Sequence, residues 1–383
     1  MQPASAPAAV KSVPPAAAVP NAEKHDVQHE LGAENTKPRE DGLIDGDDGL
    51  HFSTSALEQL EADAVALKGP GVFDVAAATL VPPSPPQTGI IRRKKKSEQL
   101  VYELAATIRT THQHVYAVSL SADNALLATA GGDDHVCVWR TDGSLVHRFK
   151  VADAGVNSLK FSSDGSMLAA GGDTGVLHLW LLAGGTGSIR HAQLTGHRSI
   201  VSGVAFTSDS RYVVSSSFDG TARIWSLERG ESLHTLEGHE GPVTAVSCSP
   251  GRTITVGHDG TVRVWNGQWM QVDLFDGFDA LNAGSTIGVM TVWGAANGEV
   301  FRDDGGYPRP LLPHRGQVRS VVVAPNGTIA TTGDDQRVMI YSRESGEPAQ
   351  SLKLPSGCWS LDVVGTHIAA GCDDGAVYLY RMT

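Results

Sequence analysis

Cysteine is scarce in this sequence. Only four of 383 residues are cysteine, and no two of them have the C-x-x-C spacing of a zinc or redox site. Cys137, Cys248 and Cys358 lie in apolar, strand-like runs, and Cys372 lies beside a turn. These positions predict buried thiols in a reducing compartment.

Long apolar runs are also missing. No segment approaches the roughly 20 apolar residues of a membrane-spanning helix, and the N-terminus lacks the apolar core of a secretion signal. We therefore expect a soluble protein with a cytoplasmic location and no membrane span. The formal net charge of −12 argues against a general nucleic-acid or anionic-membrane binder. The 43 glycines fit a turn-rich all-β protein.

The first 91 residues differ in composition from the rest. They are rich in Ala and Pro near the start and carry 5 basic and 13 acidic side chains. Such a segment cannot bury enough apolar surface to offset the entropy of ordering it. We expect residues 1–99 to be a disordered N-terminal extension in front of a domain that spans residues 100–383.

Two short segments interrupt this extension. Residues 55–58 have a capping-box pattern, and Leu57, Leu60, Ala64 and Leu67 then fall on one helical face. Residues 55–68 could form a transient helix, or a helix that docks on a partner or on the side of the domain. Five consecutive cations run from Arg92 to Lys96. They could bind a nuclear import receptor, or they could be a solvated linker.

The remaining sequence repeats itself. Six times, an aromatic residue closes a short apolar run just after an acidic turn, at Trp139, Trp180, Trp225, Trp265, Tyr341 and Tyr380. The spacings are 41, 45, 40, 76 and 39 residues, so a weakly marked unit lies in the interval of 76, with STIGVMTVW and GEVFRD as its remnants. Seven units of about 41 residues, each with four short strands, predict an array of small sheets.

Polar residues recur at matching positions in three units. His197, Ser215, Asp219 and Trp225 in the third unit correspond to His239, Thr255, Asp259 and Trp265 in the fourth, and to His314, Thr331, Asp335 and Tyr341 in the sixth. With these residues, the sequence from 100 to 383 resembles the WD-repeat β-propeller family. The resemblance implies an all-β fold: a seven-bladed β-propeller of four-stranded antiparallel sheets. It also implies closure by an N-terminal strand, residues 100–108, which completes the last blade.

The same resemblance assigns a structural role to these polar residues. In the family, the Asp accepts a hydrogen bond from the His, the His bonds the hydroxyl, and the hydroxyl meets the indole N–H. Ser, His and Asp are thus a buried stabilising network and not a catalytic triad. Other units depart from the pattern. The first has Thr129, Asp133 and Trp139 with His112 one residue out of register, the second has Thr174 in place of the Asp, and the seventh has Ala370 in place of the hydroxyl beside Asp374 and Tyr380. The fifth lacks most markers, so its register is the least certain.

No catalytic or cofactor motif stands out. The sequence has no phosphate-binding glycine loop, and the His112/His114 pair alone is weak evidence for a metal. We expect no catalytic residues, no metal and no cofactor. Phe301-Arg302-Asp303-Asp304 replaces the Phe-Arg-Arg-Gly of phosphoinositide-binding propellers, and the Trp-Asp-x-Arg of ubiquitin-ligase substrate receptors is absent after the third strands.

Binding positions can be carried over from the family. Three positions per blade point to the top face, on which partners of propellers most often bind. Here they hold Tyr116, Arg319, Trp359, His114, Phe218, His258 and Asn157, together with Gln317, Asp334 and Asp373. Tyr, Trp and Arg dominate the energetics of interfaces. We therefore predict a non-catalytic scaffold or adaptor that binds one or more proteins, as a subunit of a complex, and no nucleic acid. The alternatives are a propeller enzyme with an active site at the channel mouth and an adaptor that docks partners to an organelle or cytoskeletal structure through its tail.

Overall fold

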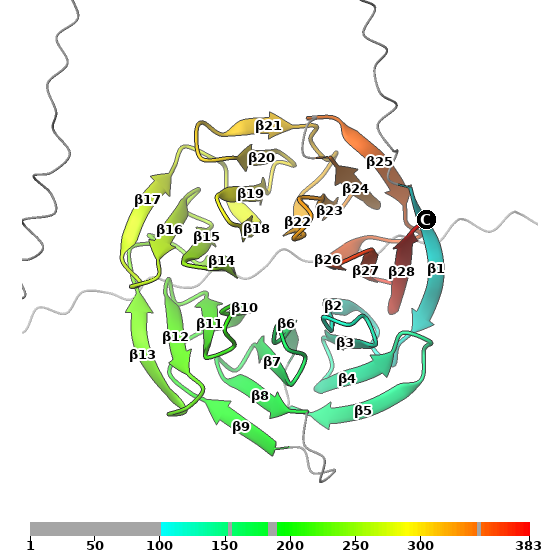
Figure 1. The fold of residues 1–383 in the computed structure, drawn as a ribbon, viewed down its shortest axis with the longest axis horizontal. Coiled ribbons are helices and arrows are strands. Elements are labelled where there is room, and N and C mark those ends of the chain that lie inside the picture. Colours follow the sequence, from blue (N-terminus) through cyan, green and yellow to red (C-terminus); the bar gives the residue numbers. More distant parts are fainter. Residues whose placement is uncertain (1–100, 152–154, 183–189, 343–345) are drawn as a thin grey trace, which may run out of the picture. The chain divides into compact units, whose positions relative to one another are not determined.

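The fold is known here from a computed structural model, which describes residues 101–383 apart from 152–154, 183–189 and 343–345. The predicted disordered extension, the helix at 55–68 and the basic run at 92–96 lie outside the described residues. The described chain forms strands arranged as seven four-stranded antiparallel sheets around a central axis (Figure 1). The predicted seven-bladed β-propeller is therefore confirmed.

In the first six blades, the strands follow the chain from the centre outward, and in the seventh β26, β27 and β28 do so while β1 lies outermost (Figure 1). The first blade comprises β2 (Val115–Leu120), β3 (Leu126–Gly131), β4 (His135–Arg140) and β5 (Leu145–Lys150). The second comprises β6 (Val156–Phe161), β7 (Met167–Gly172), β8 (Leu177–Leu181) and β9 (Arg190–Leu194). The third comprises β10 (Val201–Phe206), β11 (Tyr212–Ser217), β12 (Ala222–Ser226) and β13 (Glu231–Leu236).

The fourth blade comprises β14 (Val243–Ser249), β15 (Arg252–Gly257), β16 (Val262–Asn266) and β17 (Gln271–Phe275). The fifth comprises β18 (Leu281–Ile287), β19 (Met290–Ala295), β20 (Val300–Asp303) and β21 (Arg309–Leu311). The sixth comprises β22 (Val318–Val323), β23 (Ile329–Gly333), β24 (Arg337–Tyr341) and β25 (Pro348–Lys353). The seventh comprises β26 (Cys358–Val364), β27 (His367–Cys372), β28 (Ala376–Met382) and β1 (Tyr102–Arg109).

Short polar motifs set the turns between first and second strands. In the second blade, the Ser162 hydroxyl donates to Asp164, and the same carboxylate accepts the Ser166 N–H at 3.0 Å. This arrangement tightens the chain reversal and places Gly165 in the left-handed region, with φ at 70°. Thr207 and Asp209 make the equivalent turn in the third blade.

Closure of the ring depends on the strand nearest the N-terminus. β1 pairs antiparallel with β28 from Tyr102↔Met382 to Arg109↔Ala376, and the chain's C-terminus lies in this same blade (Figure 1). The pairing buries Tyr102 and Ile108 at 1% and 3% exposure. The predicted closing strand is therefore confirmed, and it covers the edge that β28 would otherwise present.

Hydroxyl groups on the innermost strands join the blades to one another. Ser158 of β6 accepts the N–H of Val204 in β10 at 3.0 Å, Ser285 of β18 accepts that of Val323 in β22 at 3.0 Å, and Ser320 of β22 accepts that of Leu361 in β26 at 3.2 Å. Each hydroxyl satisfies a backbone donor that the sheet's own ladder leaves free. The blades are thus held by directional bonds as well as by apolar packing.

The joint between the last blade and the first uses a carboxylate instead. Asp362 of β26 is 2% exposed and accepts the Leu120 N–H of β2 at 2.8 Å and the Ser119 hydroxyl at 3.1 Å. Lys160 of β6 reaches the same carboxylate at 2.8 Å. Asp362 therefore connects three consecutive blades at the position where the ring closes.

The weakly marked fifth blade keeps its aromatic core with a different placement. Trp293 lies on the second strand, β19, and is fully buried. Its ring packs on Phe275 and Phe278 of the preceding blade and on Phe301 of β20, at centroid distances of 5.2, 5.3 and 6.1 Å. The apolar packing explains how this blade forms without the polar markers of its neighbours.

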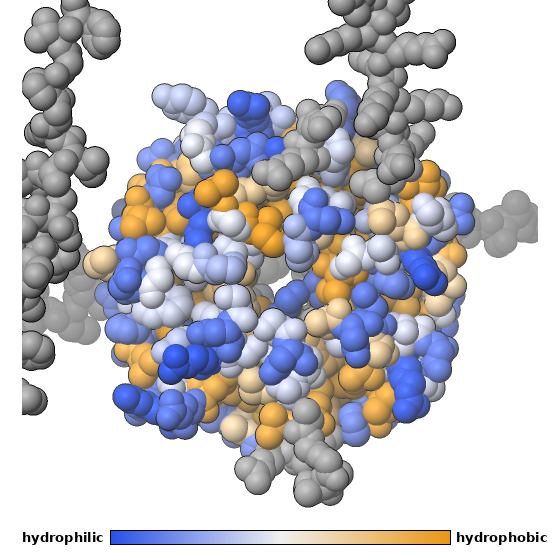
Figure 2. Space-filling model, viewed as in Figure 1, coloured by the Kyte–Doolittle hydropathy of each residue, from blue (hydrophilic) through white to orange (hydrophobic). Residues whose placement is uncertain are grey.

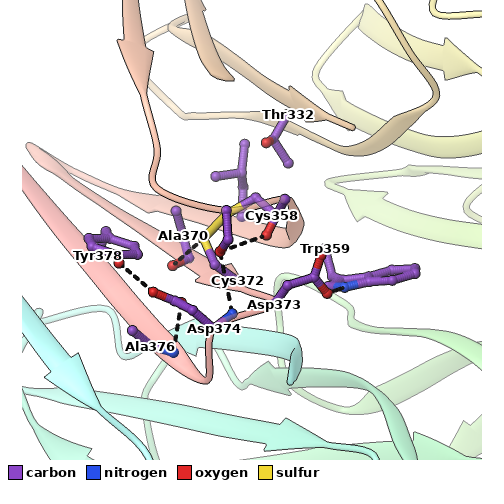
Figure 3. The surroundings of a disulfide bond; sticks show 12 residues. Thr332, Cys358, Trp359, Ala370, Cys372, Asp373, Asp374, Ala376 and Tyr378 are labelled. Atoms are coloured by element: carbon purple, nitrogen blue, oxygen red, sulfur yellow. Dashed lines mark hydrogen bonds between the residues drawn. A yellow bond between two sulfur atoms is a disulfide. The ribbon is translucent and has the colours of Figure 1, made fainter. Parts of the chain in front are cut away.

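The cysteine prediction was wrong for two of the four residues. Cys358 and Cys372 face each other across β26 and β27 and form a disulfide (Figure 3). A bulge between Cys358 and Ser360 shifts the register by one residue and brings the two sulfur atoms opposite each other. Cys137 and Cys248 are free thiols. The disulfide removes the cysteine argument for a reducing compartment.

Candidate functional site

The buried polar residues named from the repeat lie within hydrogen-bonding distance in two complete sets. In the third blade, His197 Nδ1 lies 2.9 Å from Asp219, His197 Nε2 lies 2.8 Å from Ser215 Oγ, and the Trp225 indole N–H donates to the same Oγ at 2.8 Å. In the fourth blade, His239, Asp259, Thr255 and Trp265 repeat these contacts at 2.9–3.0 Å.

The first blade contains a third complete set, so the expectation that His112 is out of register was wrong. His112 Nδ1 lies 2.5 Å from Asp133 and Nε2 lies 3.0 Å from Thr129 Oγ1. The Trp139 indole N–H donates to that oxygen at 2.9 Å. The blade lacks only the glycine that precedes the histidine in the third and fourth blades; Thr111 takes that position.

The sixth and seventh blades use tyrosines. His314 lies 2.9 Å from Asp335 and 2.8 Å from Thr331, and the Tyr341 hydroxyl donates to the Leu312 carbonyl oxygen at 2.8 Å. In the seventh blade, the Tyr378 hydroxyl donates to Asp374 at 2.6 Å (Figure 3).

Burial and hydrogen bonding set the charge states within these networks. Burial alone would raise the pKa of Asp219, but hydrogen bonds from Thr221, the Arg198 N–H and His197 outweigh it and lower the pKa to about 2. Burial lowers the pKa of His197 despite the opposing effect of Asp219. At neutral pH, a neutral imidazole thus donates to a carboxylate. Ser215 is fully buried between His197 and the indole N–H, so its hydroxyl cannot reach a substrate.

The second blade replaces the network with stacked rings. His178 Nδ1 lies 3.0 Å from His191 Nε2, and the Trp180 ring stacks on both imidazoles at centroid distances of 5.8 and 5.1 Å. Phe149 of the first blade stacks on Trp180 at 5.0 Å. Burial, together with the adjacent His191, lowers the pKa of His178 from 6.5 to about 4.

We expect this histidine to make the domain less stable in mild acid. His178 stays neutral in the folded protein between pH 6.5 and 4, whereas it gains a proton in the unfolded chain. The free energy that neutral His178 contributes to folding is therefore fully present above pH 6.5, and it falls as the pH drops toward 4. For a pKa shift of this size, proton linkage lowers the free energy of unfolding by about 1–2 kcal/mol between pH 7.5 and pH 5. Urea unfolding of wild type and His178→Phe at both pH values measures it, because Phe keeps the stacking and removes the titration. Equal pH dependence in the two proteins would contradict the assignment.

Most of the predicted binding positions line a hollow at the mouth of the central channel. Figure 2 looks onto one face of the ring and shows the opening at its centre. The hollow at the mouth measures about 570 Å³. All seven blades contribute to its lining, which consists of Tyr116, Asn157, Asp173, Ile200, Ser202, Phe218, Thr244, His258, Ala280, Asn282, Ala296, Gln317, Arg319 and Trp359.

Aromatic and charged side chains from the sixth, seventh and first blades form one connected patch at this mouth. Arg319 lies over the Trp359 ring at 4.3 Å, and Asp334 holds its guanidinium through two hydrogen bonds of 2.6 and 3.2 Å. The Trp359 indole N–H donates to Asp373 (Figure 3). Tyr116 meets Trp359 edge-on at 5.4 Å. We call Tyr116, Arg319 and Trp359 the rim patch.

The other predicted positions lie around the same mouth. His114 stacks on Tyr116 at 6.2 Å. Phe218 and His258 contact each other on the third and fourth blades at 6.0 Å. Asn157 donates to Asp173 at 2.8 Å. Sequence reasoning missed Asp173, although it precedes Thr174, the residue in the place of the network Asp; the same positional rule would have found it.

In the part of the chain that the structure describes, no group of three or more His, Cys, Asp or Glu side chains is placed to hold a metal ion. No helix within residues 101–383, outside the three gaps, has the length and hydropathy needed to cross a membrane.

Comparisons with known proteins agree with this architecture. The family model described as "WD domain, G-beta repeat" matches residues 105–140, 143–181, 188–226, 230–266 and 308–342. The chain is 28% identical over 270 residues to protein tipD of Dictyostelium discoideum, covering 64% of this chain and 43% of that protein. It is 22% identical over 316 residues to autophagy-related protein 16 of Arabidopsis thaliana, covering 76% and 60%.

A third relative is the guanine nucleotide-binding protein G(I)/G(S)/G(T) subunit beta-1 of Homarus americanus. It is 31% identical over 157 residues, which cover 39% of this chain and 46% of the relative. The chain therefore spans 43–60% of the length of these three relatives.

Proposed function

Because this chain belongs to the WD-repeat β-propeller family, we propose that it is a non-catalytic scaffold whose protein partner binds at the channel mouth. Relatives with this repeat support a general role in protein interaction. One of them is named as a subunit of a guanine nucleotide-binding protein, which is a part of an assembly. We extend this role to the present chain as a subunit of a complex.

The rim patch is the observation that carries the proposal. Arg, Trp and Tyr are the residue types that most often supply binding energy at interfaces, and here they touch one another on three consecutive blades. Arg319 is fixed by Asp334 and by the Trp359 ring before any partner arrives. Binding to a prearranged surface costs less side-chain entropy than binding to a mobile one.

Affinity purification with matched variants tests this proposal. The full chain, the triple variant Tyr116→Ala/Arg319→Ala/Trp359→Ala and a control triple variant are used as baits in lysate of the source cells, with quantification of captured proteins. The control replaces Tyr307, Arg229 and Met270 by Ala, three exposed residues away from the mouth.

We expect the main partner to be captured by wild type and control and lost from the rim-patch variant. Each rim substitution should weaken binding by more than ~1 kcal/mol, or about fivefold. Thermal melts should show that the rim-patch variant is folded. Equal capture by the rim-patch variant would place the binding site elsewhere and overturn the proposal.

Of the two alternative functions, docking through the tail does not involve the channel mouth, whereas a propeller enzyme would have its active site there. Docking to an organelle or cytoskeletal structure through the tail involves residues outside the described chain and stays a prediction. The same holds for a cytoplasmic location and for nuclear import through residues 92–96. A propeller enzyme with an active site at the channel mouth would need converging acids, bases or metal ligands there. The lining of the mouth instead consists of aromatic rings, the Arg319 side chain paired with Asp334, and the carboxylate of Asp173 among neutral side chains.

A further inference from the structure

The lining of the channel mouth is divided into two chemically different arcs. The arc formed by the sixth, seventh, first and second blades carries the charged side chains of Arg319 and Asp173 and the amides of Gln317 and Asn157, together with the rings of Trp359 and Tyr116. The opposite arc, on the third to fifth blades, has no Asp, Glu, Lys or Arg among its lining residues. It combines four apolar side chains, Ile200, Phe218, Ala280 and Ala296, with Ser202, Thr244, His258 and Asn282. A ligand that fills this hollow meets both arcs.

One carboxylate on the charged arc lacks a cationic partner. Asp334 pairs with Arg319 at 2.6 Å, and Asp373 lies 3.6 Å from His114. Asp173 is exposed and accepts only the Gly155 N–H and the Asn157 amide; within the described residues it has no ion pair with Lys, Arg or His. Asp173 therefore offers an open place for a positive charge at the edge of the hollow.

The rim patch shows how this surface holds a cation. The Arg319 guanidinium lies over one aromatic ring, and a carboxylate fixes its end. Asp173 and Tyr116 line the same hollow from adjacent blades and supply the same two components, a carboxylate and an aromatic ring. A Lys or Arg side chain of a partner satisfies both through an ion pair and a cation–π contact.

The opposite arc supplies the second anchor. Phe218 is 39% exposed, whereas most large apolar side chains of the described residues are buried. An apolar side chain of a partner can pack on the exposed part of this ring. Such a side chain removes apolar surface from water on both molecules.

We infer that the channel mouth binds a short segment of a partner protein that carries a Lys or Arg side chain and an apolar side chain a few residues apart. The basic side chain pairs with Asp173 beside Tyr116, and the apolar one packs on Phe218. The inference rests on the proposed function and names the chemistry of its partner. Acidic or phosphorylated segments are disfavoured because Asp173, Asp334 and Asp373 repel them.

A displayed library of random 12-residue peptides, selected on the immobilised full chain, tests this inference. We expect enriched peptides to combine Lys or Arg with a Leu-, Ile-, Val- or Phe-type residue. Asp173→Asn keeps the size of the side chain and one oxygen that can accept the Gly155 N–H, and it removes the charge. It should weaken an enriched peptide about two- to fivefold and reduce the preference for a basic residue. Phe218→Ala should weaken the same peptide about fivefold or more and reduce the apolar preference.

Matched controls lie on the outer strand β17, where Asp273→Asn and Val272→Ala change exposed residues of the same types. Both should leave peptide affinity unchanged. A library with no enriched peptide, enrichment of acidic peptides, or equal binding by all variants would overturn the inference. If the rim-patch variant loses its partner in lysate while the peptides show no basic–apolar preference, only this inference fails and the proposed function stands.

Discussion

Deleting residues 1–110 is expected to leave a propeller that aggregates, whereas deleting residues 1–91 should leave the domain folded. The longer deletion removes β1 and exposes the hydrogen-bonding edge of β28 from Ala376 to Met382. It also removes the buried Tyr102 and Ile108, and each large apolar side chain contributes about 1.5–3 kcal/mol when fully buried. Together with the lost strand ladder, this loss is comparable to the roughly 5–15 kcal/mol that stabilises a typical domain.

Size-exclusion chromatography and thermal unfolding of the two truncated proteins measure this effect. A synthetic peptide of residues 99–111 added to the longer deletion provides the control, because it returns the missing strand in trans. Recovery of the monomer by the peptide would attribute the defect to the open blade. A longer deletion as soluble and as heat-stable as the shorter one would mean that β1 does not close the ring.

The ring and its closure could be predicted because they depend on local patterns that repeat. An aromatic residue recurs on the third strand of six blades, and an Asp precedes it by six residues in five of them, so the count of seven units survives one weakly marked blade. His112 was harder to place because Thr111 replaces the glycine that marks the histidine in the third and fourth blades. The hydrogen bond to Asp133 forms nevertheless, because it needs only the histidine and the carboxylate, and both are present.

Features that depend on register or on distant contacts could not be predicted. Counting back from the turn of the β26–β27 hairpin would pair Cys358 with Asp373. The bulge shifts this register by one and creates the disulfide. The joint between Ser119 and Asp362 connects residues 243 positions apart, so no local pattern reveals it. The unpaired state of Asp173 likewise follows only from its surroundings in space.

The disulfide also bears on the rim patch. Cys358 directly precedes Trp359, and Cys372 directly precedes Asp373, which accepts the Trp359 indole N–H (Figure 3). The covalent link therefore fixes the two strands at the residues before this hydrogen-bonded pair. Since the pair supports the ring on which Arg319 lies, the seventh blade contributes a braced platform to the mouth.

Asp362→Ala is expected to destabilise the domain by ~2–4 kcal/mol. The substitution leaves the Leu120 N–H without its acceptor and removes the partner of Lys160 at the joint between the last blade and the first. A buried donor without a partner costs about 1–3 kcal/mol, and breaking a buried ion pair costs more, about 3–5 kcal/mol. The expected loss lies between these two ranges because the Lys160 side chain is 40% exposed and water compensates part of its loss.

Urea unfolding of matched variants separates the two contributions of this carboxylate. Asp362→Asn keeps an oxygen for the Leu120 N–H and loses the charge, so it should cost less than Asp362→Ala. Lys160→Met in both backgrounds completes a double-mutant cycle that isolates the ion pair. Asp273→Ala on β17, an exposed carboxylate, should change stability by no more than ~0.5 kcal/mol. If Asp362→Ala were as mild as this control, the closing joint would depend on apolar packing and the β1–β28 ladder alone, and the carboxylate would have no structural role there.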